Sequence, residues 1–170
     1  MNVIRQNYST ECEDALNKQI NLELQASYVY LSMAYHFQRS DVALHGLHKY
    51  FKHASDEERD HAMKFMDYQN KRGGSIRLMD VSAPPKHEWG TAKDAMSEAL
   101  ALEKRVNENL LRLHAIASNH NDAHFMDFLE GEYLTEQVDS IRAIAAHVTN
   151  LERVGEGLGV FVFDKELNKD

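Results

Sequence analysis

Four stretches of the chain place apolar residues in alternating steps of three and four, the spacing that gives an α-helix one buried face. In the second stretch the apolar positions are Leu44, Leu47, Phe51, Ala54, Phe65 and Tyr68. Glu58 and His61 fill the two steps that are missing from this series. A carboxylate and an imidazole placed in a core must be paired, neutralised or bound to a metal. Glu-x-x-His is also the ligand unit of four-helix bundles that hold two metal ions.

Local end signals divide these stretches into four long helices. Thr10-Glu11-Cys12-Glu13 is typical of a capping box at the start of the first helix. Asp41 is a predicted N-cap of the second helix, and Gly73-Gly74 is a signal for its end. The predicted helices cover about residues 10–39, 41–73, 91–120 and 122–153, each about 42 Å long.

The connections predict how the helices are arranged. Short links favour antiparallel hairpins for the first and second helices and for the third and fourth. Residues 75–90 lack helical periodicity, and sixteen extended residues are long enough to cross the whole bundle once. A short helix is predicted at about 158–167; it is too short to be stable alone, so we expect it to pack on another element, such as one of another subunit.

The predicted core of every other helix also contains polar residues. The first helix has Glu23 and Tyr30, one heptad apart, and the third has Glu103. The predicted core register of the fourth helix is Met126, Glu130, Tyr133, Gln137, Ser140, Ile144, His147 and Leu151. Taken singly, each polar residue is best explained as a core side chain held by hydrogen bonds.

Taken together, the three carboxylates Glu23, Glu58 and Glu103 are harder to explain in that way. In one dry core they would repel each other, and at least one would have to take a proton. A divalent or trivalent cation removes that repulsion. Oxygen ligands with a single histidine suit iron or manganese better than structural zinc.

Composition narrows the class of protein. The 170 residues suit one all-α domain, residues 1–170, and the formal charge of −8 argues against nucleic acid or an anionic membrane surface as a partner. No apolar run is long enough to span a membrane. The one cysteine, Cys12, cannot form an internal disulfide, and the start of the sequence has no hydrophobic signal core. These features predict a cytoplasmic protein.

Several segments of the chain resemble eukaryotic ferritin of the catalytic, heavy-chain type. They are residues 21–30 (NLELQASYVY), 57–62 (EERDHA), 70–74 (NKRGG), 102–104 (LEK) and 133–138 (YLTEQV). The resemblance covers nearly the whole chain. It implies a ferritin-like four-helix bundle with one long crossover and a short fifth C-terminal helix. It also implies an octahedral shell of twenty-four subunits, possible mixing with other ferritin subunits, and storage of iron as a ferric mineral.

The resemblance further implies a ferroxidase centre, where Fe(II) is oxidised with O2 as co-substrate. Glu23, Glu58 and His61 match the ligands of one iron site. Glu58 as a bridge and Glu103, with Gln137 close by, match the second, and Tyr30 matches a tyrosine beside the pair.

The fourth helix departs from a symmetric di-metal bundle. Such a bundle has a second Glu-x-x-His, whereas this helix offers Gln137-x-x-Ser140. An amide and a hydroxyl are neutral, weak iron ligands. We therefore expect iron to be substrate as well as catalytic metal: two Fe(II) bind, O2 oxidises them and Fe(III) leaves.

A second group of candidate iron-binding residues is His114, Asp127 and Glu130. These residues resemble those that line the three-fold entry channels of ferritin, where rings of acids attract cations. Judged without the resemblance, Asp127 and Glu130 are better explained as a solvated acidic helix start that the helix dipole favours.

A third group flanks the predicted iron ligands. Glu57 and Asp60 resemble the carboxylates of the inner cage wall where mineral nucleates, and Glu136 is a candidate to relay iron from the centre to the cavity. The alternative for each is an ordinary surface charge.

Three other functions fit the sequence less well. A di-iron oxidoreductase with a fixed cofactor calls for a second Glu-x-x-His, which is missing. A non-catalytic shell subunit would lack the ferroxidase ligands, which are present. A helical cytokine calls for a signal peptide and disulfides, and the sequence shows neither.

Overall fold

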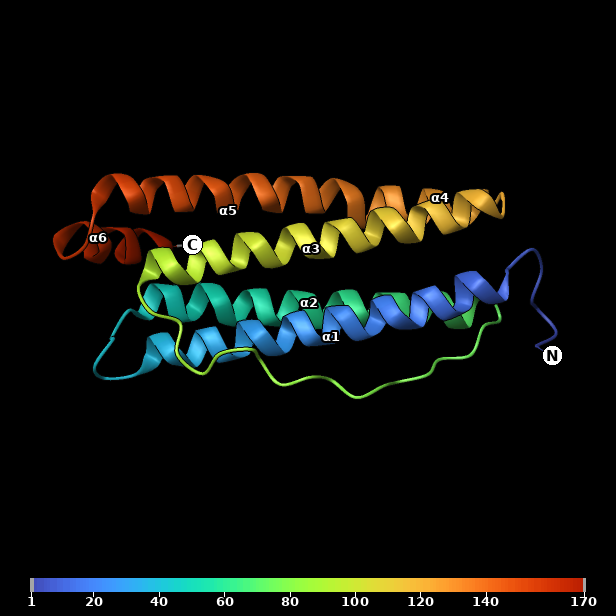
Figure 1. Ribbon diagram of the computed structural model, residues 1–170, viewed down its shortest axis with the longest axis horizontal. Helices are drawn as coiled ribbons and strands as arrows, with labels where there is room; N and C mark the ends of the chain where they lie inside the picture. The colour runs from blue at the N-terminus through green and yellow to red at the C-terminus, as the bar shows by residue number, and fades with distance from the viewer. Residues whose placement is uncertain (1, 170) are drawn as a thin grey trace.

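The computed structural model describes residues 2–169, and that part of the chain consists of helices and their connecting segments, without β-strands (Figure 1). Its elements are α1 (Thr10–Gln38), α2 (His45–Lys71), α3 (Ala92–Asn119), α4 (Ala123–Leu129), η1 (Glu130–Leu134), α5 (Thr135–Val154) and α6 (Leu158–Leu167). The predicted all-α class, a four-helix bundle with a short C-terminal helix, is confirmed. None of the described helices is long and apolar enough to cross a membrane.

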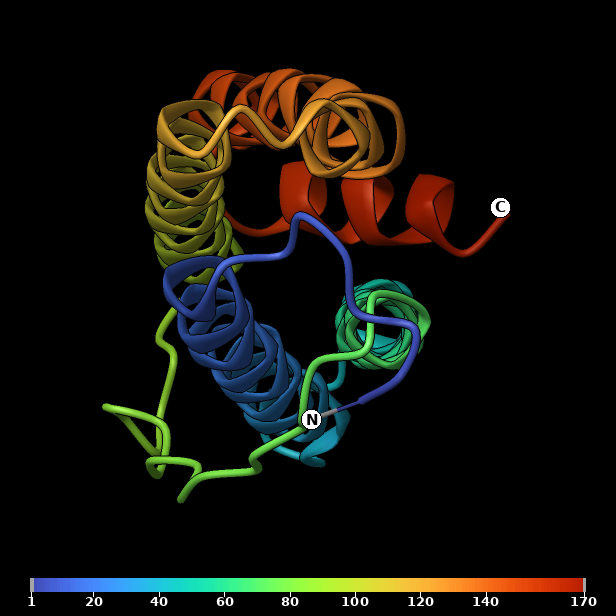
Figure 2. The same cartoon turned by 90° about the vertical axis from the view of Figure 1, so that its right-hand side faces the viewer.

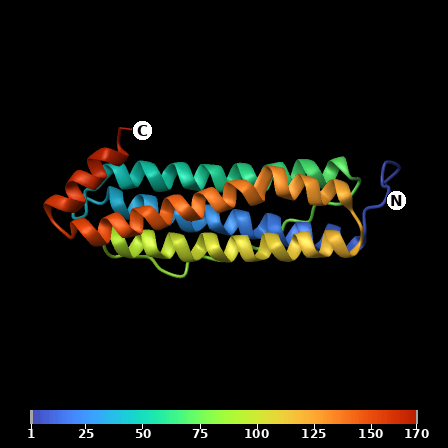
Figure 3. The same ribbon diagram turned by 90° about the horizontal axis from the view of Figure 1, so that it is seen from above.

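The bundle consists of two antiparallel hairpins. α1 packs along α2, and α3 packs along the continuous helix that α4, η1 and α5 form (Figures 1 and 3). The segment between α2 and α3 runs the length of the bundle on its outside, next to α1 (Figures 1 and 2). The single long crossover expected from residues 75–90 is therefore present.

The helix starts are capped nearly as the sequence indicates. The hydroxyl of Ser9, one residue before the predicted Thr10, accepts a hydrogen bond from the N–H of Cys12. Thr91 and Asp94 form a reciprocal capping box at α3. The Asp122 carboxylate caps α4 by accepting from the N–H of Phe125.

The prediction that Asp41 caps the second helix is wrong. α2 begins at His45, and its N-cap residue, Leu44, makes no side-chain cap. Asp41 instead pairs with Arg39 at 2.6 Å and 2.9 Å. The cap comes from α6, where the buried carboxylate of Asp164 accepts the N–H of Leu47 at 2.8 Å.

α6 uses this contact to pack on its own bundle. It crosses the end of the bundle at an angle and contacts α2 and α5 (Figure 3). A side chain at Gly46 would overlap the backbone oxygen of Asp164, so the close approach of α6 to α2 requires glycine there. The opposite face of α6 leaves Leu158 and Val162 exposed.

The predicted core register of the fourth helix is wrong in its first half. The buried residues there are Phe125 and Leu129, whereas Met126 is only half-buried and Glu130 is exposed. η1 is a turn of π-helix, which adds one residue to the helix and shifts the register by one position. From Tyr133 onward the predicted positions Gln137, Ile144 and Leu151 are buried as expected.

The core is divided along its length into two apolar clusters. One is built on the start of α1 and the end of α2, with Leu16, Phe65, and Phe125 among its members. The other is built on the end of α1 and the start of α2, with Phe37 and Phe51. Buried polar side chains lie between the two clusters, at the middle of the bundle: Glu23, Glu58, Glu103 and Gln137.

Candidate metal centre

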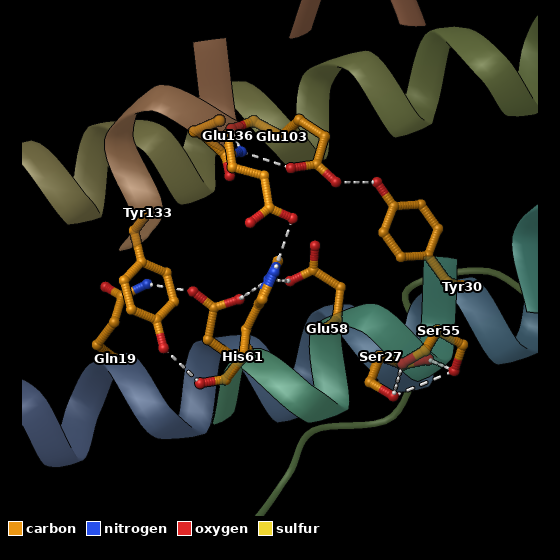
Figure 4. A network of polar contacts seen from close by, with 11 residues as sticks. Gln19, Ser27, Tyr30, Ser55, Glu58, His61, Glu103, Tyr133 and Glu136 are labelled. Atoms are coloured by element: carbon orange, nitrogen blue, oxygen red, sulfur yellow. Dashed lines mark hydrogen bonds and ion pairs between the residues drawn. The ribbon is translucent and has the colours of Figure 1, made fainter. Parts of the chain in front are cut away.

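The buried polar layer brings together residues from all four long helices (Figure 4). Glu23 comes from α1, Glu58 and His61 from α2, Glu103 from α3 and Gln137 from α5. Each takes a position on the apolar stripe of its helix, so the same packing that forms the core also gathers these side chains.

Glu23, Glu58 and His61 form the tightest group. One ligand atom from each residue lies within 4.8 Å of the others. His61 Nδ1 is 3.9 Å from Oε2 of Glu23 and 3.7 Å from Oε2 of Glu58. Both Oε2 atoms are buried and have no hydrogen-bond partner among the described residues. An unsatisfied buried oxygen is unfavourable, so two of them beside an imidazole indicate a site built for a cation.

Electrostatics support this view. Burial raises the pKa of Glu23 well above its ordinary value, and the nearby charge of Glu58 adds to the effect. Burial also raises the pKa of Glu58, and Glu103 contributes to that rise. A bound cation would replace these protons, and two carboxylates with one imidazole fit Fe(II).

Glu103 lies in the same layer, but both of its carboxylate oxygens are already bonded. The Tyr30 hydroxyl donates to Oε1 at 2.5 Å. The Gln137 amide donates to Oε2 at 2.5 Å and to the Glu103 backbone oxygen at 2.9 Å. A metal ligated by Glu103 would therefore share these oxygens with the two donors or displace one of them. Burial, and next the charge of Glu103, raise the pKa of Tyr30, which keeps its hydroxyl protonated as a donor.

A cavity of about 110 Å³ adjoins the buried layer. Its walls include Tyr30, Glu58, His61, Glu103 and Gln137, so it gives access to both candidate iron positions. Ser140, Glu57 and Glu136 also line it.

The residues predicted to flank the centre fall into different environments. Glu136 reaches His61, with Oε1 3.0 Å from Nε2, and is itself about half exposed. Glu57 is exposed and pairs with His53 at 3.0 Å. Asp60 is exposed, and its side chain makes no hydrogen bond or ion pair with the described residues. Of the three, Glu136 alone touches a predicted ligand.

The predicted channel residues lie apart from the centre, near the hairpin between α3 and α4. His114 Nε2 is 3.0 Å from Oε1 of Glu130, so these two are brought together. Asp127 is exposed on α4, one turn before Glu130.

Two residues of the site were not singled out in the sequence. Gln19 is buried and donates its amide hydrogen to Oε1 of Glu23 at 2.9 Å. Tyr133 donates its hydroxyl hydrogen to the backbone oxygen of His61 at 2.8 Å (Figure 4). The spacing of Gln19, one helical turn before the predicted ligand Glu23, is the sequence signal for such a partner, but it does not show that Gln19 is buried.

Comparison with known proteins gives one consistent family. Residues 13–154 match the family model described as the ferritin-like domain. The chain is 59% identical to soma ferritin of Lymnaea stagnalis over 162 residues, covering 95% of this chain and 93% of that protein. It is 55% identical to the ferritin-1 heavy chain of Schistosoma mansoni, covering 98% and 96%. It is 52% identical to the middle subunit of ferritin from Aquarana catesbeiana, covering 98% and 97%.

Proposed function

Because the chain belongs to the ferritin family, we propose that it is a ferroxidase-active ferritin subunit that takes up Fe(II), oxidises it with O2 and stores it as ferric mineral. The observation that carries the proposal is the buried group Glu23, Glu58 and His61, with two carboxylate oxygens that lack partners. A shell subunit without catalytic activity would have no reason to keep these groups in a dry core.

In this proposal the two iron positions differ in whether their ligand atoms already accept hydrogen bonds. Glu23, Glu58 and His61 present free ligand atoms, so the first Fe(II) binds there without breaking hydrogen bonds. At the second position both oxygens of Glu103 already accept hydrogen bonds, from Tyr30 and Gln137, and a metal would compete with these donors. We expect the second ion to bind more weakly.

Two Fe(II) held close together would each give one electron to the same O2, which takes up two protons and leaves as hydrogen peroxide. The second position offers neutral Gln137 and half-buried Ser140 in place of a second Glu-x-x-His. Such weak ligands favour release of Fe(III) over its retention as a fixed cofactor. We propose that iron leaves through the cavity lined by Glu57 and Glu136, with Asp60 nearby on the surface of α2.

Storage requires a closed container, and we propose that this chain assembles into the twenty-four-subunit shell of its family, alone or with other ferritin subunits. His114, Asp127 and Glu130 are proposed to line the entry channels between subunits, where negative charge attracts Fe(II). A cytosolic location fits the buried free thiol of Cys12.

Gel filtration before and after addition of Fe(II) in air tests the proposal. We expect the protein to elute as a large shell and to acquire an iron core that stays with the protein peak. Elution as a monomer that never retains ferric iron would contradict the proposal.

A further inference from the structure

The two carboxylate oxygens of Glu23 have different surroundings. Oε1 accepts a hydrogen bond from Nε2 of Gln19 at 2.9 Å. Oε2 has no hydrogen-bond partner and lies 3.9 Å from Nδ1 of His61. Gln19 and Glu23 are one helical turn apart on α1, with 2% and 1% of their surfaces exposed. The carboxylate is thus held on the side away from the other ligands and free on the side facing them.

The chemistry of this donor matters because the site has to attract a cation. A lysine or arginine at position 19 would orient the carboxylate equally well, but it would also neutralise the charge and compete with the metal. A neutral amide fixes the orientation and leaves the negative charge available. Hydrogen bonds of this kind to metal ligands orient them and raise metal affinity.

We infer that Gln19 is a positioning residue: its amide holds Oε1 of Glu23 so that Oε2 is presented to the metal together with Glu58 and His61. The inference rests on the proposed function, since it concerns the same metal site. It assigns to Gln19 a part in metal capture without direct contact with the metal.

His61 shows the same arrangement, which strengthens the inference. Its Nε2 lies 3.0 Å from Glu136, while Nδ1 faces Glu23 and Glu58 (Figure 4). Glu103 differs, because both of its oxygens are bonded. Gln19 therefore supports the first metal position alone, and its loss is expected to leave the second position unchanged.

The test is a calorimetric titration of the assembled, metal-free protein with Co(II), which substitutes for Fe(II) and is stable in air. Gln19→Met keeps the volume of the side chain and removes the N–H donor. We expect the tighter class of Co(II) sites to weaken about 10- to 100-fold, with the weaker class unchanged. The visible spectrum of the bound Co(II) is expected to shift as well, because its ligand geometry changes.

Gln25→Met is the matched control. Gln25 is another glutamine of α1; it is half-buried and lines a separate cavity with Val29 and Trp89. The Co(II) affinity of the Gln25→Met variant is expected to equal that of the unmodified protein. If Gln19→Met does not fold, Gln19→Asn, which withdraws the amide by one methylene, is expected to show the same loss.

Different results separate the two claims. If the unmodified protein binds Co(II) tightly and the Gln19 variants bind it equally well with the same spectrum, the role of Gln19 is refuted while the proposed function stands. If the unmodified protein has no tight Co(II) site, the proposed function fails.

Discussion

At the scale of single residues, Glu58 disfavours folding and is also the proposed shared ligand of two iron positions. It is 5% exposed, and one of its oxygens has no partner among the described residues. Metal binding requires its charged form, whereas burial favours its neutral form. The stability of the metal-free protein should therefore depend on pH through Glu58.

The sign of this dependence follows from the pKa of Glu58, which burial raises from 4.5 to about 8. A raised pKa in the folded state adds stability below the unfolded pKa, and that stability is lost as the pH rises through the folded pKa. Between pH 4.5 and about 8 the metal-free protein should become less stable through this group.

Glu58→Gln removes the charge and keeps the shape of the side chain. In the metal-free state, we expect the variant to have a higher thermal unfolding midpoint than the unmodified protein, and the difference should grow with pH. Each kcal/mol corresponds to about 2–4 °C for a chain of this size. If the variant and the unmodified protein have the same midpoint at both pH 5 and pH 8, burial of Glu58 does not destabilise the metal-free protein. Glu57→Gln, which changes an exposed neighbour, is the control.

Single residues also differ in how visible they are in the sequence. Glu23, Glu58 and Glu103 interrupt apolar stripes, so periodicity alone locates them. Gln19 lies beside the stripe that runs through Leu16, Ile20 and Glu23, and polar residues there are normally solvated. Its burial depends on the helices packed against α1, which a single helix does not reveal.

At the scale of elements, α6 supplies the N-terminal cap that α2 lacks. The start of α2 has no local cap, and the carboxylate of Asp164, 117 residues from Leu47 in sequence, takes that role. Gly46 allows the close approach.

Asp164→Ala should weaken the docking of α6, because it leaves the N–H of Leu47 without its acceptor. Loss of a helix cap costs about 1 kcal/mol, so we expect α6 to separate from the bundle more often. Limited proteolysis of the isolated subunit is expected to cleave near residues 155–158 faster than in the unmodified protein. Asp127→Ala, at an exposed acid, serves as the control. Equal cleavage rates would mean that other contacts hold α6.

The same elements show where sequence reasoning succeeds. Helix lengths, the antiparallel hairpins and the long crossover follow from periodicity and loop length. The cap from Asp164 was missed because N-cap rules consider local residues. The π turn was missed because alternating steps of three and four contain no signal for one added residue. Its trace in the sequence is the run Phe125, Leu129, Tyr133 and Gln137, which are separated by successive steps of four.

At the scale of the whole molecule, the buried polar layer and the bundle depend on each other. Two apolar clusters stabilise the ends of the bundle, and the acids between them are held in place by that packing. The proposed first metal position presents oxygens without hydrogen-bond partners among the described residues, whereas both oxygens of Glu103 at the second already accept hydrogen bonds. This asymmetry is the physical basis for the central claim that iron passes through the centre and is stored elsewhere.

An isotope pulse and chase tests that claim most directly. The metal-free shell receives two ⁵⁷Fe(II) per subunit in air, followed by a large excess of ⁵⁶Fe(II), and Mössbauer spectra follow the ⁵⁷Fe. We predict that the ⁵⁷Fe is oxidised and then moves from a paired signal to the mineral signal as the chase proceeds. A ⁵⁷Fe pair that stays at two per subunit through many turnovers would contradict the account and indicate a fixed di-iron cofactor.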